Sequence, residues 1–305
     1  ASVVKVVTLV AYAEAEAAGA LNPLTPIPLA DIDAFDLPRT NLGAHNRAVA
    51  ELDELGRLTG EPPTVLLEDV PWMMTRHSSN AASDYLHLLL GQQRIEQTAV
   101  SLGLTTQTAP CPFLAKFLAM ANHAAPTSLR SFLAEPASYG ETAMLLVDAY
   151  VSSEAFRQQE QAWRGNRSRP SFSTQYQFSH TLDPQASARE YAALMARLAQ
   201  NGLSSSEASF TARLYLERPM RVFPINQELF TYLGYKNGTL PGILTTAYYG
   251  YPADGSSPVV VALFYRDLPN RTYQQWRFQL PHDDFARWLL VDPQAVPLLR
   301  QLTTP

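Results

Sequence analysis

Apolar and polar positions divide the chain into a long helical part and a shorter strand-rich part. Residues 2–21 are apolar on nearly every face of a helix, which predicts a buried helix, and Asn22 with Pro23 predicts its end. A proline-rich loop is expected over residues 23–38. Apolar residues at helical spacing then predict further helices over residues 44–58 and 66–76, with one or two more within residues 81–103.

The middle of the chain is also predicted to be helical. Asp183 and Pro184 are typical of a helix start and Gly202 of a helix end, so a helix is expected over residues 184–201. The polar residues 164–173 are interpreted as a mobile loop. Helical spacing predicts four other helices, over residues 113–121, 128–133, 140–163 and 206–218.

Near residue 230 the pattern changes to that of strands. Residues 233–236 and 242–251 are rich in Thr, Tyr and Ile, and residues 259–265 form a continuous β-branched and aromatic run. We predict two antiparallel strands joined by a turn over residues 252–257, with the Lys236 segment considered as part of the first. Two final helices, over residues 283–290 and 295–302, are expected to pack on the sheet.

This order of elements predicts an α+β fold. The 305 residues, 46% of them hydrophobic, are enough to bury a large core. Because no internal repeat or linker is evident, a single domain is expected. It would consist of a helical lobe of about residues 22–218 and a sheet lobe of about residues 219–305, with the N-terminal helix at the lobe boundary.

Ser2 and Lys5 are the first candidates for chemistry. They lie three residues apart at the start of a predicted helix, so their side chains share one helical face. A lysine whose ammonium form is disfavoured by burial can accept a proton, and the serine hydroxyl beside it then becomes a nucleophile. The same spacing at the start of an apolar helix is also common without catalysis.

Two other short groups each have a structural interpretation as well as a chemical one. The group from Ser78 to Asn80 precedes a predicted helix and is a natural N-cap, because Ser and Asn oxygens accept hydrogen bonds from free N–H groups. The group from Lys236 to Gly238 contains Asn-Gly, which is typical of a hairpin turn.

Taken in order, the three groups resemble the motif set of the penicillin-recognising serine enzymes: class A β-lactamases, penicillin-binding D,D-peptidases and related esterases. Residues 65–86 resemble the family's helix-loop-helix around Ser-x-Asn, and residues 233–238 resemble the strand of Lys-[Thr/Ser]-Gly. Residues 181–184 and the run after them resemble the helix before that strand, whereas residues 104–178 match nothing in the family. The resemblance implies a β-lactamase/transpeptidase-like fold, an antiparallel sheet flanked by helices plus an all-helical lobe.

The resemblance also implies catalytic roles for four residues. Ser2 would attack an amide or ester carbonyl with Lys5 as its base, and Ser78 would relay the proton to the leaving group. Lys236 would keep the potential positive and help to bind an acidic group of the substrate. The substrate is then a small or peptide-like molecule, such as a β-lactam.

Substrate-binding roles follow from the same resemblance. Asn80 would bind the side-chain amide of the substrate. Backbone N–H groups of Ser2 and Thr239 would form an oxyanion hole, aimed at charge that appears only in the transition state. Gly238 would let the strand approach the substrate closely.

Two positions depart from the family pattern. Ser79 stands where class A enzymes usually have Asp, which favours penicillin-binding behaviour over a dedicated β-lactamase. Asn237 replaces the Thr or Ser hydroxyl that helps to bind the substrate carboxylate, and its amide would donate from a longer arm.

The acid that deacylates class A enzymes has no counterpart in the expected interval. Residues 105–116 contain no carboxylate. Glu135 and Glu141 come later and are candidates only if an insertion directs that segment toward Ser2; otherwise they are ordinary exposed carboxylates. Without such a base, a bound β-lactam is expected to acylate Ser2 and to stay there.

Charge and composition narrow the function classes. A net charge of −5 with scattered Lys and Arg gives no reason to expect nucleic acid or an anionic membrane as a partner. The single cysteine, Cys111, excludes an intramolecular disulfide and is interpreted as a packed side chain. The six histidines show no zinc spacing, so neither a metal nor a cofactor is predicted. His77 is a candidate general base beside Ser78, but histidines beside helices more often have no catalytic role.

No transmembrane helix is predicted, because Lys5, Glu14 and Glu16 interrupt the apolar N-terminal run. A nucleophile one residue from a chain end would lie on a frayed terminus, so we expect that residues precede Ala1 in the native protein. The resemblance implies a bacterial, extracytoplasmic protein, periplasmic or secreted. The oligomeric state stays open.

Three function classes remain open from the sequence. The first is a serine hydrolase that forms an acyl-enzyme on amides or esters. The second is an esterase or acyltransferase relative, for which the unmatched residues 104–178 would reshape the cleft. The third is an inactive binding protein on the same fold, which Asn237 and the missing Glu favour and the paired Ser2 and Lys5 oppose.

Overall fold

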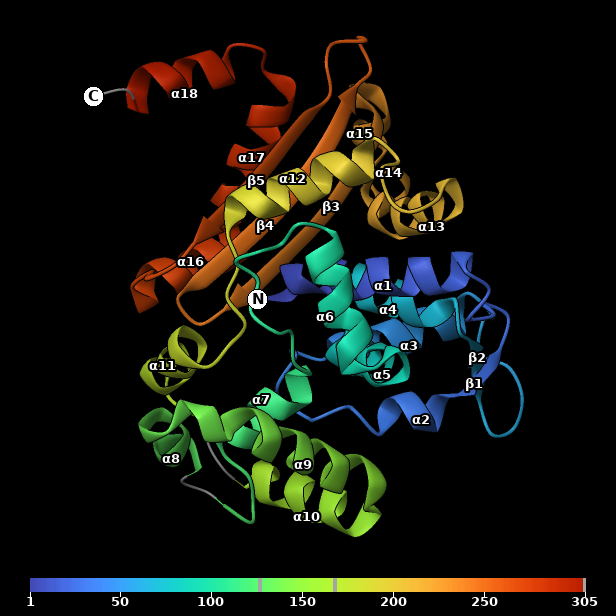
Figure 1. Cartoon of the computed structure of the whole chain (residues 1–305), viewed down its shortest axis with the longest axis vertical. Coiled ribbons are helices and arrows are strands. Elements are labelled where there is room, and N and C mark those ends of the chain that lie inside the picture. Colours follow the sequence, from blue (N-terminus) through green and yellow to red (C-terminus); the bar gives the residue numbers. More distant parts are fainter. Residues whose placement is uncertain (126–127, 167–168, 304–305) are drawn as a thin grey trace. The chain divides into compact units, whose positions relative to one another are not determined.

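The computed structural model describes residues 1–125, 128–166 and 169–303. The chain forms two compact units. Unit 1 contains residues 1–6, 100–106 and 186–305, and unit 2 contains residues 7–99 and 107–185. Figure 1 labels the helices and strands of both.

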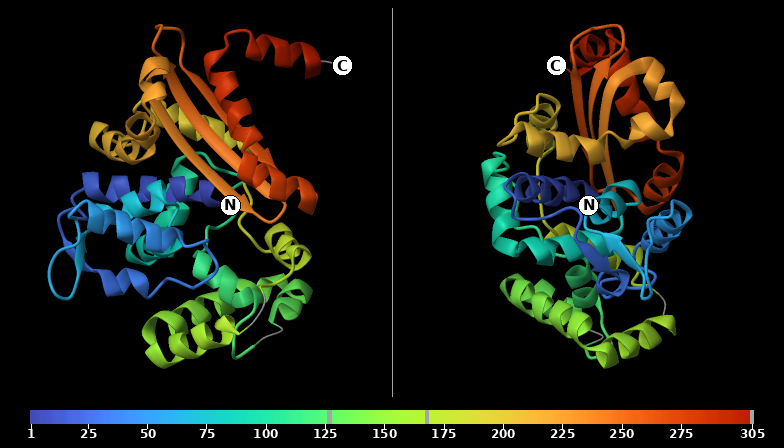
Figure 2. Two further views of the ribbon diagram at one scale, coloured as in Figure 1. Left: turned by 180° about the vertical axis from the view of Figure 1, so that it is seen from behind. Right: turned by 90° about the vertical axis from the view of Figure 1, so that its right-hand side faces the viewer.

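Unit 1 is built on a three-stranded antiparallel sheet in the order β3-β4-β5. Its strands are β3 (Phe230–Leu240), β4 (Ile243–Pro252) and β5 (Val259–Tyr265), which lie side by side in every view (Figures 1 and 2). The alternative interpretation of Lys236 to Gly238 as a hairpin turn is wrong. These residues lie inside β3, where Asn237 pairs with Thr246 of β4.

Alternate residues of β5 face opposite sides of the sheet, as the period of a strand requires. Val261 belongs to a buried core with Leu289 and Leu290 of α17 (Pro281–Val291). Phe264 points to the other side, where its ring lies 5.4 Å from that of Tyr191 in α12 (Ala188–Ala199). The sheet is therefore covered by a helix on each face.

The helix before the sheet starts later than predicted. Asp183 and Pro184 do not begin it; α12 begins at Ala188, because the Ser187 hydroxyl accepts a hydrogen bond from the backbone N–H of Glu190 at 3.3 Å. The other helices of unit 1 are η1 (Ser2–Val4), α13 (Ser206–Leu216), α14 (Arg218–Val222), α15 (Pro224–Leu229), α16 (Asn270–Gln279) and α18 (Ala295–Thr303). Neither α16 nor the short α14 and α15 were predicted from the sequence.

Unit 2 is mostly helical, with one small sheet of β1 (Pro26–Pro28) and β2 (Thr64–Leu66). Its helices are α2 (Leu29–Asp33), α3 (Ala44–Glu54), α4 (Asp69–Arg76), α5 (Asn80–Leu90), α7 (Phe113–Met120), α8 (Ser128–Ala134), η2 (Pro136–Ser138), α9 (Tyr139–Ser152), α10 (Glu154–Gly165) and α11 (Phe172–Thr181). Two more helices, α1 (Lys5–Ala17) and α6 (Gln92–Ser101), begin in one unit and end in the other.

The single helix predicted over residues 140–163 is in fact two helices, α9 and α10, which pack against each other (Figure 2). The break is at Ser153, whose backbone is extended and whose hydroxyl accepts a hydrogen bond from the N–H of Phe156 at 3.2 Å. Within the predicted mobile loop over residues 164–173, residues 167–168 lie outside the described part of the chain.

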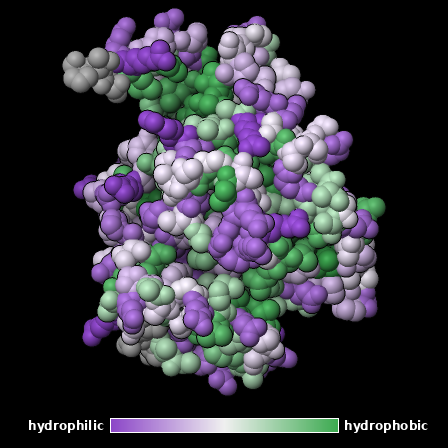
Figure 3. Space-filling view, viewed as in Figure 1, coloured by the Kyte–Doolittle hydropathy of each residue, from purple (hydrophilic) through white to green (hydrophobic). Residues whose placement is uncertain are grey.

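Unit 1 exposes several large apolar side chains. Val296, Leu298 and Leu302 of α18 are exposed, and apolar surface is visible beside this helix in the upper part of Figure 3. Phe210 of α13 and Phe223, which precedes α15, are exposed as well. In the described residues, no helix is both long and apolar enough to cross a membrane.

We predict that Gly234→Ala destabilises the sheet. A Cβ atom at Gly234 would lie 2.1 Å from Cε1 of Tyr249, a buried residue whose hydroxyl donates a hydrogen bond to Glu217 at 2.9 Å. The free energy of unfolding should fall by about 1–3 kcal/mol, measured by urea denaturation. Gly140→Ala in α9 is the matched control, because no atom lies within 4 Å of its added methyl group. Equal stability of the two variants would contradict the prediction.

Candidate active site

Within unit 1, the predicted nucleophile lies against the predicted Lys-x-Gly strand. Ser2 is in the short helix η1, which packs on β3 and β4. A Cβ atom built on Gly238 would lie 2.4 Å from the backbone nitrogen of Ser2 and 2.9 Å from Cβ of Ala1. Only glycine permits this approach of η1 to the strand. Residues 2 and 238, far apart in sequence, are therefore neighbours in space.

Lys5 follows Ser2 after one turn. The chain passes from η1 into α1 at this residue, and Lys5 is fully buried, whereas Ser2 is half-buried. The lysine amine thus lies away from bulk water, which is the environment predicted for a lysine that acts as a base.

Lys236 is the second buried lysine of unit 1. Its Nζ donates a hydrogen bond to the carbonyl oxygen of Asn237 at 2.8 Å. Burial and, after it, the positive charge of Arg218 lower the pKa of Lys236 to about 7, while the carboxylate of Asp283 opposes the shift. Near neutral pH, Lys236 therefore exists in both its charged and its neutral form.

Arg218 was not singled out from the sequence. It begins α14, which packs on β3, and this packing brings a second positive charge toward Lys236. No motif around Arg218 marks it, because its position depends on how the chain returns to the strand. The sequence shows only that Arg218 is a basic residue at the end of the helix predicted over residues 206–218.

The rest of the β3 motif is held from its neighbours in unit 1. Thr245 of β4 donates a hydrogen bond from its hydroxyl to the carbonyl oxygen of Gly238 at 3.3 Å. The hydroxyl of Thr239 lies 3.1 Å from that of Tyr273 in α16. Asn237 is half-buried and Thr239 is exposed. The segment that would form half of an oxyanion hole is therefore fixed by hydrogen bonds on two sides.

Ser78 and Asn80 belong to unit 2, at the start of α5. Ser78 is held in the left-handed region with φ of 59°, which is uncommon for a residue other than glycine. Its carbonyl oxygen accepts a hydrogen bond from Nδ2 of Asn41 at 3.0 Å. The predicted N-cap is confirmed at Ser79, whose hydroxyl accepts from the N–H of Ala82 at 3.2 Å. A capped helix start and a motif on the same residues are compatible.

The other candidate residues of unit 2 have structural surroundings. Nε2 of His77 lies 2.6 Å from a carboxylate oxygen of Glu51, so this ring nitrogen already has a hydrogen-bond partner. Glu135 and Glu141 are both exposed, near the start of α9. These surroundings match the ordinary interpretations of all three residues.

Unit 2 fixes the segment in which class A enzymes carry their deacylating acid. The buried carboxylate of Asp84 accepts hydrogen bonds from the N–H groups of Phe113 at 2.8 Å and Leu114 at 2.7 Å, at the start of α7. One turn later, the buried Lys116 forms an ion pair with Asp183. These contacts anchor residues 113–116, and none of them could be predicted from local sequence.

In the part of the chain that the structure describes, no group of three or more His, Cys, Asp or Glu side chains is placed to hold a metal ion.

Comparison with known families shows to which family the chain belongs. A model described as the β-lactamase enzyme family matches residues 1–276. The chain belongs to the β-lactamase enzyme family. Its α+β architecture is the β-lactamase/transpeptidase-like fold, and membership in the family identifies it as a serine hydrolase, as the sequence predicted.

Solved structures with the same fold include β-lactamases and PBP-A. A β-lactamase from Sphaerobacter thermophilus DSM 20745 is 18% identical with a TM-score of 0.56, and the match covers 100% of this chain and 84% of that chain. PBP-A is 14% identical with a TM-score of 0.51, covering 91% and 77%. A PBP-A mutant solved as an acyl-enzyme complex with penicillin G is 15% identical with a TM-score of 0.50, covering 90% and 77%. These identities support likeness of fold alone, and no curated protein sequence matches the chain.

We predict that Lys236→Met stabilises this β-lactamase family member below pH 7. A lysine with a pKa of about 7 in the folded state and 10.5 otherwise binds more protons when unfolded between these pH values, so stability rises with pH across that range. Relative to that of Lys236→Met, the free energy of unfolding of the wild type should rise by about 2–3 kcal/mol between pH 6 and pH 9. Urea denaturation at both pH values measures the difference, and a pH-independent difference would contradict the assigned pKa.

Proposed function

We propose that this chain hydrolyses an amide or ester substrate through an acyl-enzyme on Ser2. The observation that carries the proposal is the close approach of the Ser2 backbone to Gly238, which would leave only 2.4 Å between the Ser2 nitrogen and an added Cβ atom. It supports a common role for a Ser-x-x-Lys group and a Lys-x-Gly group that are separated by more than 200 residues of sequence.

Lys5 takes the proton of Ser2 as the hydroxyl attacks the substrate carbonyl. The full burial of its side chain supports this role, because a desolvated amine holds a proton less firmly than one in water. Ser78 then passes the proton to the leaving group, and Asn80 binds the side-chain amide of the substrate. The left-handed backbone of Ser78 supports a functional role, since strained residues cluster at active sites.

Backbone N–H groups of Ser2 and Thr239 form the oxyanion hole in this proposal. Such donors are effective when they are fixed before the reaction, because no reorganisation is then needed as charge develops. The hydrogen bonds that hold Gly238 and Thr239 to Thr245 and Tyr273 support this assignment. Lys236 and Asn237 bind an acidic group of the substrate.

Deacylation is slow in this proposal. The segment over residues 105–116 lacks a carboxylate, and its anchors at Asp84 and Asp183 hold it in place without one. The substrate is a β-lactam or a peptide-like molecule, and a β-lactam remains attached to Ser2. The acyl-enzyme complex of the PBP-A mutant with penicillin G is consistent with this behaviour on a similar fold.

An esterase or acyltransferase is the second candidate function. Asn237 supports it, because the amide replaces the hydroxyl that helps members of the family to bind a carboxylate. A substrate without a carboxylate would not need that hydroxyl. An inactive binding protein is a third hypothesis that the same residue supports.

For each of the three functions, we propose a location outside the cytoplasm, periplasmic or secreted, as is common in the family.

Intact mass spectrometry tests the acyl-enzyme directly. After exposure to a penicillin, a cephalosporin or a fluorophosphonate, the wild type should gain the mass of one adduct, and the β-lactam adducts should persist for hours. Ser2→Ala should remain unlabelled and Lys5→Ala should label at least 100-fold more slowly. Absence of any adduct on folded wild-type protein would exclude the hydrolase and favour the binding protein.

The charge of Lys236 predicts a pH dependence that differs between substrates. Because its pKa is about 7, the acylation rate with a substrate that carries a carboxylate should fall as the pH rises from 6 to 8, relative to its neutral methyl ester. Lys236→Arg keeps its charge over this range, so its ratio of the two rates should stay constant. A constant ratio in the wild type would remove Lys236 from carboxylate binding and support the esterase.

A further inference from the structure

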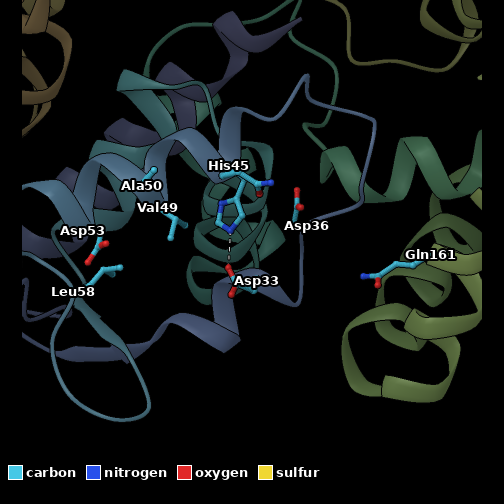
Figure 4. A pocket seen from close by; sticks show the side chains of 9 residues that line it. Asp33, Asp36, His45, Val49, Ala50, Asp53, Leu58 and Gln161 are labelled. Carbon is cyan, nitrogen blue, oxygen red and sulfur yellow. Dashed lines mark hydrogen bonds and ion pairs between the residues drawn. The ribbon is translucent and has the colours of Figure 1, made fainter. Parts of the chain in front are cut away.

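A chain of hydrogen bonds in unit 2 leads from a cavity to the middle residue of the Ser-x-Asn group. Nδ1 of His45, in α3, lies 3.0 Å from the hydroxyl oxygen of Ser79. Nε2 of the same ring lies 2.7 Å from a carboxylate oxygen of Asp33, at the end of α2. His45 and Asp33 line a cavity of about 480 Å³ together with Asp36, Asp53 and Gln161 (Figure 4).

One arrangement of protons satisfies every group in this chain. If Nε2 of His45 carries the ring proton, it donates to the carboxylate of Asp33, and Nδ1 is free to accept. The Ser79 hydroxyl then donates to Nδ1, while its oxygen accepts from the N–H of Ala82 at 3.2 Å. A proton on Nδ1 would leave the Ser79 hydroxyl hydrogen without this acceptor in a fully buried position.

The trio of Ser79, His45 and Asp33 has the residue types of a catalytic triad but not its accessibility. Ser79 is fully buried, so a substrate carbonyl cannot reach its hydroxyl. Its oxygen is also committed to capping α5. A nucleophilic serine needs the opposite surroundings, with an exposed oxygen beside a donor set for the oxyanion.

What the trio holds is the backbone on either side of Ser79. Ser78, whose φ is 59°, adopts a left-handed conformation that surrounding contacts must maintain. Asn41 holds its carbonyl oxygen at 3.0 Å, and the N–H of Ser79 donates to the carbonyl oxygen of Met73 at 3.2 Å. The hydrogen bond to His45 adds a third anchor, on the side chain of Ser79.

We propose that His45 and Asp33 are positioning residues, which hold the Ser78 and Asn80 side chains in their reactive orientation through Ser79. The proposal rests on the proposed function, in which Ser78 relays a proton and Asn80 binds substrate. Asp33 orients the His45 ring and selects its tautomer, and His45 holds Ser79. Ser79, the middle residue of the Ser-x-Asn group, is thereby connected to the carboxylate of Asp33 through two hydrogen bonds.

The charged neighbours of the trio allow a matched comparison. Asp33 and Asp53 both line the cavity, but only Asp33 has a hydrogen bond to His45 among the described contacts. Asp36 also lines the cavity, and burial, reinforced by the negative charge of Asp33, raises its pKa. Replacing Asp33 and Asp53 in turn therefore separates the orienting hydrogen bond from the general negative potential of the cavity.

The first test is the rate constant for acylation of Ser2 by a fluorophosphonate, followed by intact mass spectrometry. Asp33→Ala and His45→Leu should each slow acylation roughly tenfold, as expected for loss of one hydrogen bond that holds the reactive state. Asp33→Asn keeps an acceptor for Nε2 and should recover most of the rate. Asp53→Ala should match the wild type. Wild-type rates in Asp33→Ala, or no recovery in Asp33→Asn, would overturn the proposal.

A second measurement does not depend on any reaction. In protein labelled with 15N-histidine, His45 should show an unprotonated Nδ1 and a protonated Nε2, with His45→Leu assigning the signals. The backbone amide signals of Ser78 and Asn80 should shift in Asp33→Ala and stay in place in Asp53→Ala. The opposite tautomer, or unmoved amides, would overturn the positioning role. Failure of Ser2 to react in the wild type, with these signals as expected, would instead overturn the proposed function alone.

Discussion

The approach of Ser2 to Gly238 is the contact on which the rest of unit 1 depends. A strand can pass this close to the backbone of another segment only where it has no side chain, and the neighbouring residues then have to keep both partners in place. Thr245 holds the carbonyl of Gly238 from the next strand, while the sheet itself is held between α12 and α17. The packing of α12 and α17 on the sheet is thus linked to the position of β3 beside Ser2.

Much of this organisation follows from local sequence. The helix-to-sheet order, the α+β class and the cap at Ser79 could be predicted, because apolar period and capping residues act over a few positions. The family could also be identified from three short groups in their order. Local signals were ambiguous in places, and alternatives then had to stay open. Asn237 and Gly238 are typical of a turn, yet their partners in β4 make them part of a strand.

Contacts between distant residues account for what the sequence did not reveal. Arg218 acts on Lys236 only because α14 returns to β3, and Asp84 caps α7 across nearly thirty residues of chain. His45 and Asp33 carry no motif, and their relation to Ser79 depends on how α2, α3 and α5 meet. Periodicity describes which face of a helix is buried, but not which polar group on another helix it will meet.

The lowered pKa of Lys236 has a consequence for how such a protein can change over generations. A buried amine near another cation makes folding less favourable at neutral and acidic pH. An apolar residue in place of Lys236 would therefore give a more stable protein. Selection for robustness alone would therefore tend to remove the lysine. Stability therefore does not explain why a lysine occupies this buried position in the strand that packs beside Ser2.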